Sequence, residues 1–229
     1  MDMLIVEDVM LLLLDDATGT VPGSSNLHLV LGGAVLIELA LTEKVMVEPD
    51  RSRWRSPRVF PVPGAPVPAD PLLAGALGLI AAQPRTATDL VDRLGRDLRD
   101  HVAQRLANRG MVQLKTGKVL GLFPTTSWPA LDPSHEQELR GTLDLVLARG
   151  ATPDARTAAV IALMNATDLL HRVFGVPGVH PKVIRARGKE IAQGQWAAKA
   201  VTDAIAAANA AVMASIAAAT AATTAATTS

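Results

Sequence analysis

The segment "LVLGGAVLIELAL" constrains the fold most; it runs from Leu29 to Leu41 with Glu38 as its one charged residue. A helix that spans a bilayer needs about 20 apolar residues, because the hydrocarbon layer is about 30 Å thick. This segment has 13 residues and is too short to span. A helix that is apolar almost all round is typical of a central helix surrounded by others. We therefore predict a buried core helix, in which Gly32 and Gly33 permit a close contact with a neighbouring helix.

The rest of the chain predicts further helices separated by strand-like segments. Apolar periodicity predicts helices near residues 6–14, 71–82, 86–94, 98–108, 135–148, 154–173, 180–193 and 195–218. Valines at 45–47 and 59–62 predict a hairpin with a charged tip, and "MVQLKTGKVLGLFP" predicts another with "KTGK" as its turn. We predict a mostly α fold: a single helical domain over residues 1–218 around a central hydrophobic helix bundle, with one or two small β-hairpins and a low-complexity Ala/Thr tail at 219–229.

Motifs of common catalytic sites are absent from the sequence. The chain has no cysteine, which excludes disulfides and thiolate metal sites and fits a cytosolic protein. Its five histidines are not paired at metal-ligand spacing, and no nucleophile elbow, phosphate-binding loop or dinucleotide fingerprint occurs. We therefore predict that the protein is not an enzyme and has no catalytic residue, metal site or cofactor.

The net charge is zero, but the charges are unevenly distributed. Residues 1–50 contain nine acids and one lysine, whereas residues 51–118 contain twelve basic and five acidic residues. A basic middle region suggests a polyanion as partner. Acidic and basic regions that neutralise each other on one surface would give the same pattern.

An arginine series in "RLGRDLRDHVAQRLANRG" is the clearest candidate binding site. Arg93, Arg96 and Arg99 recur every three residues, which places them on a common side of a helix. The guanidinium group matches phosphate oxygens, and a helix break near residues 95–98 would add free backbone N–H groups. The alternative is local ion pairing with the aspartates at 92, 97 and 100.

A second basic run, "RSRWRSPR", surrounds Trp54 with arginines and contains no acid. Each cation near an anionic membrane contributes about 1 kcal/mol, and tryptophan favours the interface. We predict membrane contact through Arg51, Arg53, Trp54 and Arg55; the alternative is a loop in which Trp54 folds back on the protein.

The helices at 86–94 and 98–108 and the following hairpin also have the outline of a winged helix-turn-helix. Against DNA binding, Asp97 and Asp100 would face phosphate, and the second helix has few base-reading side chains. We expect no nucleic acid as partner.

Several segments together resemble the Golgi phosphoprotein 3-like family. They are "VEDVMLLLLDDATG", "LGGAVLIELAL", "LRDHVAQRLANRGMV" with "KVLGLFPTTSWP", and "AAVIALMNATDLLHRVF". They occur in the family's order and cover the chain from about Leu4 to Met213. The resemblance implies a helical fold around a central bundle, no enzymatic activity, and peripheral membrane association through a basic pocket for phosphatidylinositol 4-phosphate.

The resemblance also implies which residues bind the lipid phosphate. In eukaryotic members the pocket uses one tryptophan and three arginines. Two of these arginines correspond to Arg96 and Arg99, the third to Gly32, and the tryptophan roughly to Gly23. The family's hairpin, here Val112–Phe123, is implied in self-association.

The resemblance suggests a bacterial member, because the alanine-rich chain starts at the first core helix, without the basic tail of eukaryotic members. We expect a cytoplasmic protein that is peripherally associated with the inner face of a membrane. Its expected partner is an anionic inositol-containing lipid headgroup, and its expected role is that of a non-enzymatic adaptor. The alternatives are a soluble helical scaffold that has lost lipid binding, and a winged-helix-like DNA binder.

Overall fold

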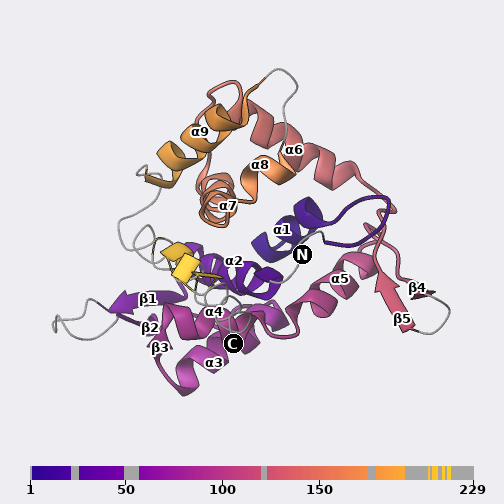
Figure 1. Cartoon of the computed structure of the whole chain (residues 1–229). Coiled ribbons are helices and arrows are strands. Elements are labelled where there is room, and N and C mark those ends of the chain that lie inside the picture. Colours follow the sequence, from indigo (N-terminus) through magenta and orange to yellow (C-terminus); the bar gives the residue numbers. More distant parts are fainter. Residues whose placement is uncertain are drawn as a thin grey trace, which may run out of the picture.

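The structure is a computed structural model that describes residues 2–21, 26–48, 57–119, 123–174 and 179–193 of the chain. It also describes helical residues 206, 208–210, 213, 214, 216 and 217. Across these residues the fold contains nine helices and two small antiparallel sheets, which confirms the predicted mostly α class (Figure 1). The predicted Ala/Thr tail at 219–229 lies outside the described residues.

Most observed helices begin and end within a few residues of their predicted bounds. The helices described between residues 2 and 193 are α1 (Ile5–Leu13), α2 (Leu27–Leu41), α3 (Pro71–Ala82), α4 (Ala87–Gly95), α5 (Leu98–Asn108), α6 (Ser134–Leu147), α7 (Ala155–Ala166), α8 (Leu170–Val173) and α9 (Pro181–Gln193). No helix in the described part of the chain is long and apolar enough to cross a bilayer.

The helix α2 is the centre of the fold, as its apolar sequence predicts. It packs against α1, α3, α4, α5 and α7 and against the strand that follows it. Figure 1 shows α6–α9 on one side of α2, and α3, α4 and α5 on the other. Every residue from Leu29 to Ala40 is buried, including Glu38. The predicted core helix is therefore confirmed.

Two glycines allow α2 and α4 to approach until their backbones touch. A Cβ atom on Gly32 would lie 2.0 Å from the carbonyl oxygen of Val91. A Cβ atom on Gly95 would lie 1.9 Å from the carbonyl oxygen of His28. Side chains at these positions would overlap backbone atoms, so only glycine fits. The close helix contact predicted for Gly32 is confirmed, and its partner is α4.

The predicted hairpin of alternating valines forms, and a third short strand extends it. β1 (Val45–Glu48) and β2 (Arg58–Pro61) pair antiparallel, with Val47 opposite Val59. β3 (Arg85–Thr86) pairs with β2 as well, so β2 is the central strand. The sequence does not predict β3, because two residues cannot show the alternation that marks a strand.

The second hairpin also forms, but the prediction that "KTGK" is its turn is wrong. β4 (Lys115–Val119) pairs antiparallel with β5 (Phe123–Ser127), so these four residues form most of β4. A bridge between Val112 and Ala130 fixes the register at the base of the hairpin. This register moves the reversal of the chain beyond Val119, to residues outside the described ranges.

The predicted helix over 154–173 is too long, because it divides into α7 and α8. The Thr167 hydroxyl donates hydrogen bonds to the carbonyl oxygens of Leu163 and Met164, at 3.0 and 3.2 Å. Asp168 then adopts a left-handed φ of 55°. A left-handed residue does not continue a right-handed helix, so α7 ends here. The predicted helix over 195–218 falls largely outside the described residues.

Candidate functional site

Arg96 and Arg99 lie on either side of the turn between α4 and α5. α4 ends at Gly95, Arg96 follows with φ −60° and ψ 132°, and Asp97 has a left-handed φ of 62°. α5 begins at Leu98, whose buried side chain joins the turn to the core. The predicted helix break is confirmed, and both arginines are exposed.

The two arginines differ in their ion pairs. Nη2 of Arg96 donates to Oδ2 of Asp92 at 2.5 Å, although 66% of the Arg96 side chain remains exposed. Within the described ranges, the Arg99 side chain has no hydrogen bond or ion pair, and neither Asp97 nor Asp100 pairs with either arginine. Local ion pairing, the alternative to phosphate binding, therefore applies to Arg96 and not to Arg99.

Arg93, the first arginine of the series, is neutralised along α4. Its Nε donates to Oδ1 of Asp89 at 2.9 Å, while Nη1 of Arg85 donates to Oδ2 at 2.8 Å. Slight burial acts to raise the pKa of Asp89, but the hydrogen bonds from both arginines lower it overall. Arg93 thus pairs with Asp89 in the first turn of α4 and not with a residue of the α4–α5 turn.

His28 of α2 reaches the same turn from the neighbouring helix. Its Nε2 lies 3.6 Å from Oδ1 of Asp92, the residue whose other oxygen accepts from Arg96. The side chains of His28 and Asp92 are 41% and 38% exposed, so the pair lies at the surface. Sequence reasoning missed this contact, because no short-range pattern connects the two residues.

The first turn of α5 places backbone donors next to Arg99. The first N–H groups of a helix have no partner within the helix, and the Asp97 side chain does not cap them. The partial positive charge of a helix N-terminus favours an anion there. Arg96, Arg99 and the uncapped first turn of α5 therefore lie next to one another along the chain, and both arginine side chains are exposed.

The position of Gly32 cannot hold a side chain in this chain. Because its Cβ would lie 2.0 Å from the Val91 carbonyl oxygen, α4 occupies the space that a longer residue would need. The packing of α2 on α4 thus excludes a longer side chain at position 32.

The remaining predicted site residues lie outside the described ranges. They are Gly23 and the basic run with Arg51, Arg53, Trp54 and Arg55. The structure describes the arms of that hairpin, β1 and β2, and not its tip.

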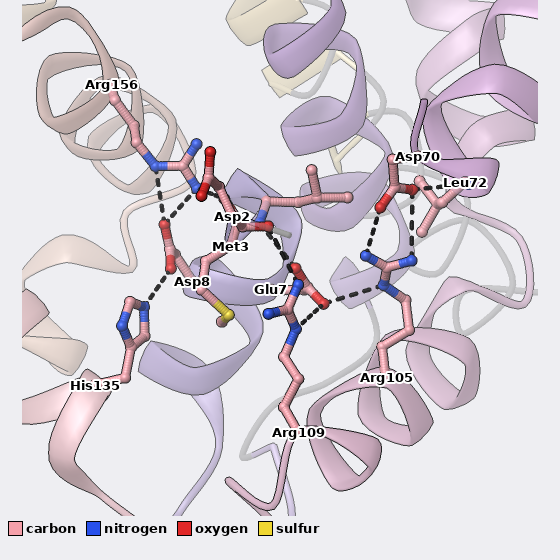
Figure 2. Close-up of polar contacts among 11 residues, drawn as sticks. Asp2, Met3, Glu7, Asp8, Asp70, Leu72, Arg105, Arg109, His135 and Arg156 are labelled. Atoms are coloured by element: carbon pink, nitrogen blue, oxygen red, sulfur yellow. Dashed lines mark hydrogen bonds and ion pairs between the residues drawn. The ribbon is translucent and has the colours of Figure 1, made fainter. Parts of the chain in front are cut away.

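A large cluster of charges is buried beside α1, and sequence reasoning missed it (Figure 2). Glu7 is 0% exposed and accepts hydrogen bonds from Nε of Arg105 at 3.0 Å and Nε of Arg109 at 3.2 Å. Its other oxygen accepts from the amide of Leu4 at 2.8 Å. Arg105 also donates to Asp70, the N-cap of α3, at 2.8 Å. These contacts fasten α5 to α1 and α3.

On its other side, α1 is fastened to α6 and α7. Oδ2 of Asp8 accepts from Nη2 of Arg156 at 2.7 Å, and its Oδ1 lies 2.8 Å from Nε2 of His135 (Figure 2). Arg156 also contacts Glu38 of α2 at 3.3 Å. Glu38 accepts from the amide of Ile5 at 2.5 Å.

Burial and opposite charges together set the ionisation of Glu38 and Arg156 in this cluster. Burial raises the pKa of Glu38, while the Ile5 amide and Arg156 act in the opposite direction. Burial also acts to lower the pKa of Arg156, but the carboxylates of Asp8 and Glu38 raise it overall. Each of these charges has an opposite partner, which suits a cluster that holds helices together. Within the described ranges, no group of His, Asp or Glu side chains is arranged to hold a metal ion.

Comparison with known protein families gives a match over most of the chain. A family model described as Golgi phosphoprotein 3 (GPP34) matches residues 5–208, a range that includes every helix from α1 to α9. No curated protein matches the chain significantly.

Proposed function

The chain belongs to the Golgi phosphoprotein 3 (GPP34) family, and on that basis we propose that it is a non-enzymatic, peripheral membrane adaptor. It binds an anionic inositol-containing lipid headgroup, such as that of phosphatidylinositol 4-phosphate, on the cytoplasmic face of a membrane. Arg96 and Arg99 bind the lipid phosphate.

The observation that carries the proposal is the exposed Arg99 side chain at the first turn of α5. Its guanidinium group has no ion-pair partner among the described residues. Arg96 lies three residues earlier and keeps 66% of its side chain exposed despite its pair with Asp92. A phosphate at this turn could accept hydrogen bonds from guanidinium groups and from backbone amides together.

Two further contacts complete the proposal. Stable attachment of a peripheral protein generally needs two signals, and the basic run with Trp54, which lies between β1 and β2 in the sequence, supplies the second one. The Val112–Phe123 hairpin, which projects from the body of the molecule at the right of Figure 1, mediates self-association. A homo-oligomer would present several lipid sites to one membrane, which increases avidity.

The DNA-binding alternative has less support than lipid binding. A recognition helix presents basic and amide side chains to the DNA groove. However, Arg105 of α5 and Arg109, which caps its C-terminus, pair with buried Glu7. Gln104 and Asn108 hydrogen-bond each other at 3.1 Å. We therefore expect no nucleic acid as partner.

Liposome pelleting tests the proposed function directly. The chain should pellet with phosphatidylcholine vesicles that contain phosphatidylinositol 4-phosphate or phosphatidylinositol, and remain in the supernatant with phosphatidylcholine alone. Binding should weaken at about 1 M salt, where the Debye length falls to about 3 Å. A chain that pellets with neither kind of vesicle would instead support the soluble scaffold.

A further inference from the structure

We infer that His28 is a third cation of the Arg96/Arg99 site and makes anionic-lipid binding stronger as the pH falls. This inference rests on the proposed function and adds that pH regulates lipid binding at the same site.

The crossing of the two helices fixes the position of His28. A Cβ atom on Gly95 would lie 1.9 Å from the carbonyl oxygen of His28. One turn later in α2, a Cβ atom on Gly32 would lie 2.0 Å from the carbonyl oxygen of Val91. Two backbone contacts on one helix face leave little freedom to slide or rotate. The His28 side chain is therefore held over α4, close to the residue that precedes the turn.

Asp92 connects His28 to the arginine site. One carboxylate oxygen lies 3.6 Å from Nε2 of His28, and the other accepts from Nη2 of Arg96 at 2.5 Å. When the imidazole of His28 is neutral, the negative charge of Asp92 and the positive charge of Arg96 cancel. With a protonated imidazole, one carboxylate lies between two cations, and the group of three carries a net charge of about +1.

The charges on the neighbouring helices make this single proton important. Between residues 85 and 100, which include α4 and the start of α5, four arginines are balanced by four aspartates. They are Arg85, Arg93, Arg96 and Arg99 with Asp89, Asp92, Asp97 and Asp100. Asp89 is already engaged by Arg85 and Arg93. Because the formal charges of this segment sum to zero, a proton on His28 adds one positive charge beside the arginine site.

Imidazole is the ordinary side-chain group whose charge changes within the pH range of cells. A cation near an anionic membrane surface contributes about 1 kcal/mol. That contribution corresponds to binding about five-fold tighter at about pH 5.5 than at about pH 7.5.

Phosphatidylglycerol vesicles are the probe, because their phosphodiester keeps one charge over this range. The parent chain should bind them about five-fold tighter at the lower pH. His28→Gln should bind equally at both pH values, and His28→Arg, which carries a permanent charge, should bind tightly at both. The matched control is His101→Gln, because His101 is also exposed and follows the charged segment on α5. It should keep the parent's ratio. Circular dichroism verifies that each variant is folded.

The possible failures are distinguishable. If His28→Gln keeps the parent's pH ratio, or if His101→Gln abolishes it, the inference about His28 is wrong while the proposed function stands. If Arg96→Ala/Arg99→Ala binds as well as the parent at both pH values, the proposed site is wrong, and the role of His28 falls with it.

Discussion

Gly32 of α2 and Val91 of α4 are in direct backbone contact: a Cβ atom on Gly32 would lie 2.0 Å from the Val91 carbonyl oxygen. This contact sets how closely the central helix approaches the helix that leads to Arg96. The packing of the core and the geometry of the candidate site therefore depend on the same glycine.

Gly32→Ala should destabilise the protein by about 2 kcal/mol or more, because the added methyl overlaps backbone atoms that cannot move away individually. Urea unfolding measures the change. The matched control is Gly78→Ala on α3, where nothing lies within 4 Å of the Cβ position. It should stabilise by about 0.5 to 1 kcal/mol through helix propensity. Equal stability of the two variants would contradict the close contact.

Glu7→Gln should destabilise by about 3 to 5 kcal/mol, because it removes the buried negative charge that Arg105 and Arg109 share. Asp144→Asn is the control, since Asp144 pairs with an Arg149 side chain that is 72% exposed. Asp144→Asn should lower the free energy of unfolding by less than about 1 kcal/mol. A small effect of Glu7→Gln would mean that the cluster does not hold α1 in place.

The helices could be predicted from the sequence because their signals are local. α3 begins with Asp70, whose side chain accepts from the Leu72 amide, and with Pro71 in the first turn. α4 begins with Thr86, whose hydroxyl accepts from the Asp89 amide at 3.3 Å. The core position of α2 followed from the absence of a polar face.

The missed features depend on contacts between residues far apart in the chain. The pair of Glu7 with Arg105 spans 98 positions, and that of Asp8 with Arg156 spans 148. No short-range pattern encodes them. The turn of the second hairpin was misplaced for a related reason, since its register is set by the bridge between Val112 and Ala130 rather than by the residues of the turn. In the candidate site, the sequence predicted both arginines but not the contact of His28 with Asp92.

Asp16→Asn should stabilise the protein at about pH 7 but not at about pH 3, where carboxyl groups are protonated. Glu136 of α6 is buried, and this burial raises its pKa; Asp16 raises it further, against the effect of Arg140. A folded-state pKa above the unfolded value means that stability falls as pH rises through that range. Removing the Asp16 charge relieves part of that loss, which thermal unfolding at both pH values would detect.

Asp15→Asn should have the opposite effect. The amide and hydroxyl of Thr18 donate to Asp15 at 2.8 Å and lower its pKa. The contribution of Asp15 to the free energy of unfolding is present above the pKa that this group has in the unfolded chain, and is lost as pH falls through its pKa in the folded protein. The substitution should therefore destabilise at about pH 7. If both neighbouring variants change stability in the same direction, these assignments are wrong.

Leu114→Asp should reduce self-association if the Val112–Phe123 hairpin forms the contact between copies. Leu114 is 49% exposed at the start of this hairpin, and a buried charge at an interface is costly. Leu145→Asp provides the control, since Leu145 is 50% exposed on α6. Sedimentation velocity should show more monomer for the hairpin variant only. An unchanged distribution for Leu114→Asp would argue for a different interface.

The most direct test of lipid binding compares two double variants that remove the same charge. Arg96→Ala/Arg99→Ala removes the candidate phosphate ligands. Arg149→Ala/Arg185→Ala removes two arginines that are 72% and 45% exposed, one just after α6 and one on α9; these two helices lie across the molecule from α4 (Figure 1). Binding to vesicles that contain phosphatidylinositol 4-phosphate is measured by pelleting. We predict about thirty-fold weaker binding for the first variant, at about 1 kcal/mol per cation, and near-parental binding for the second. Equal loss in both variants, or none in either, would contradict a lipid site at Arg96 and Arg99.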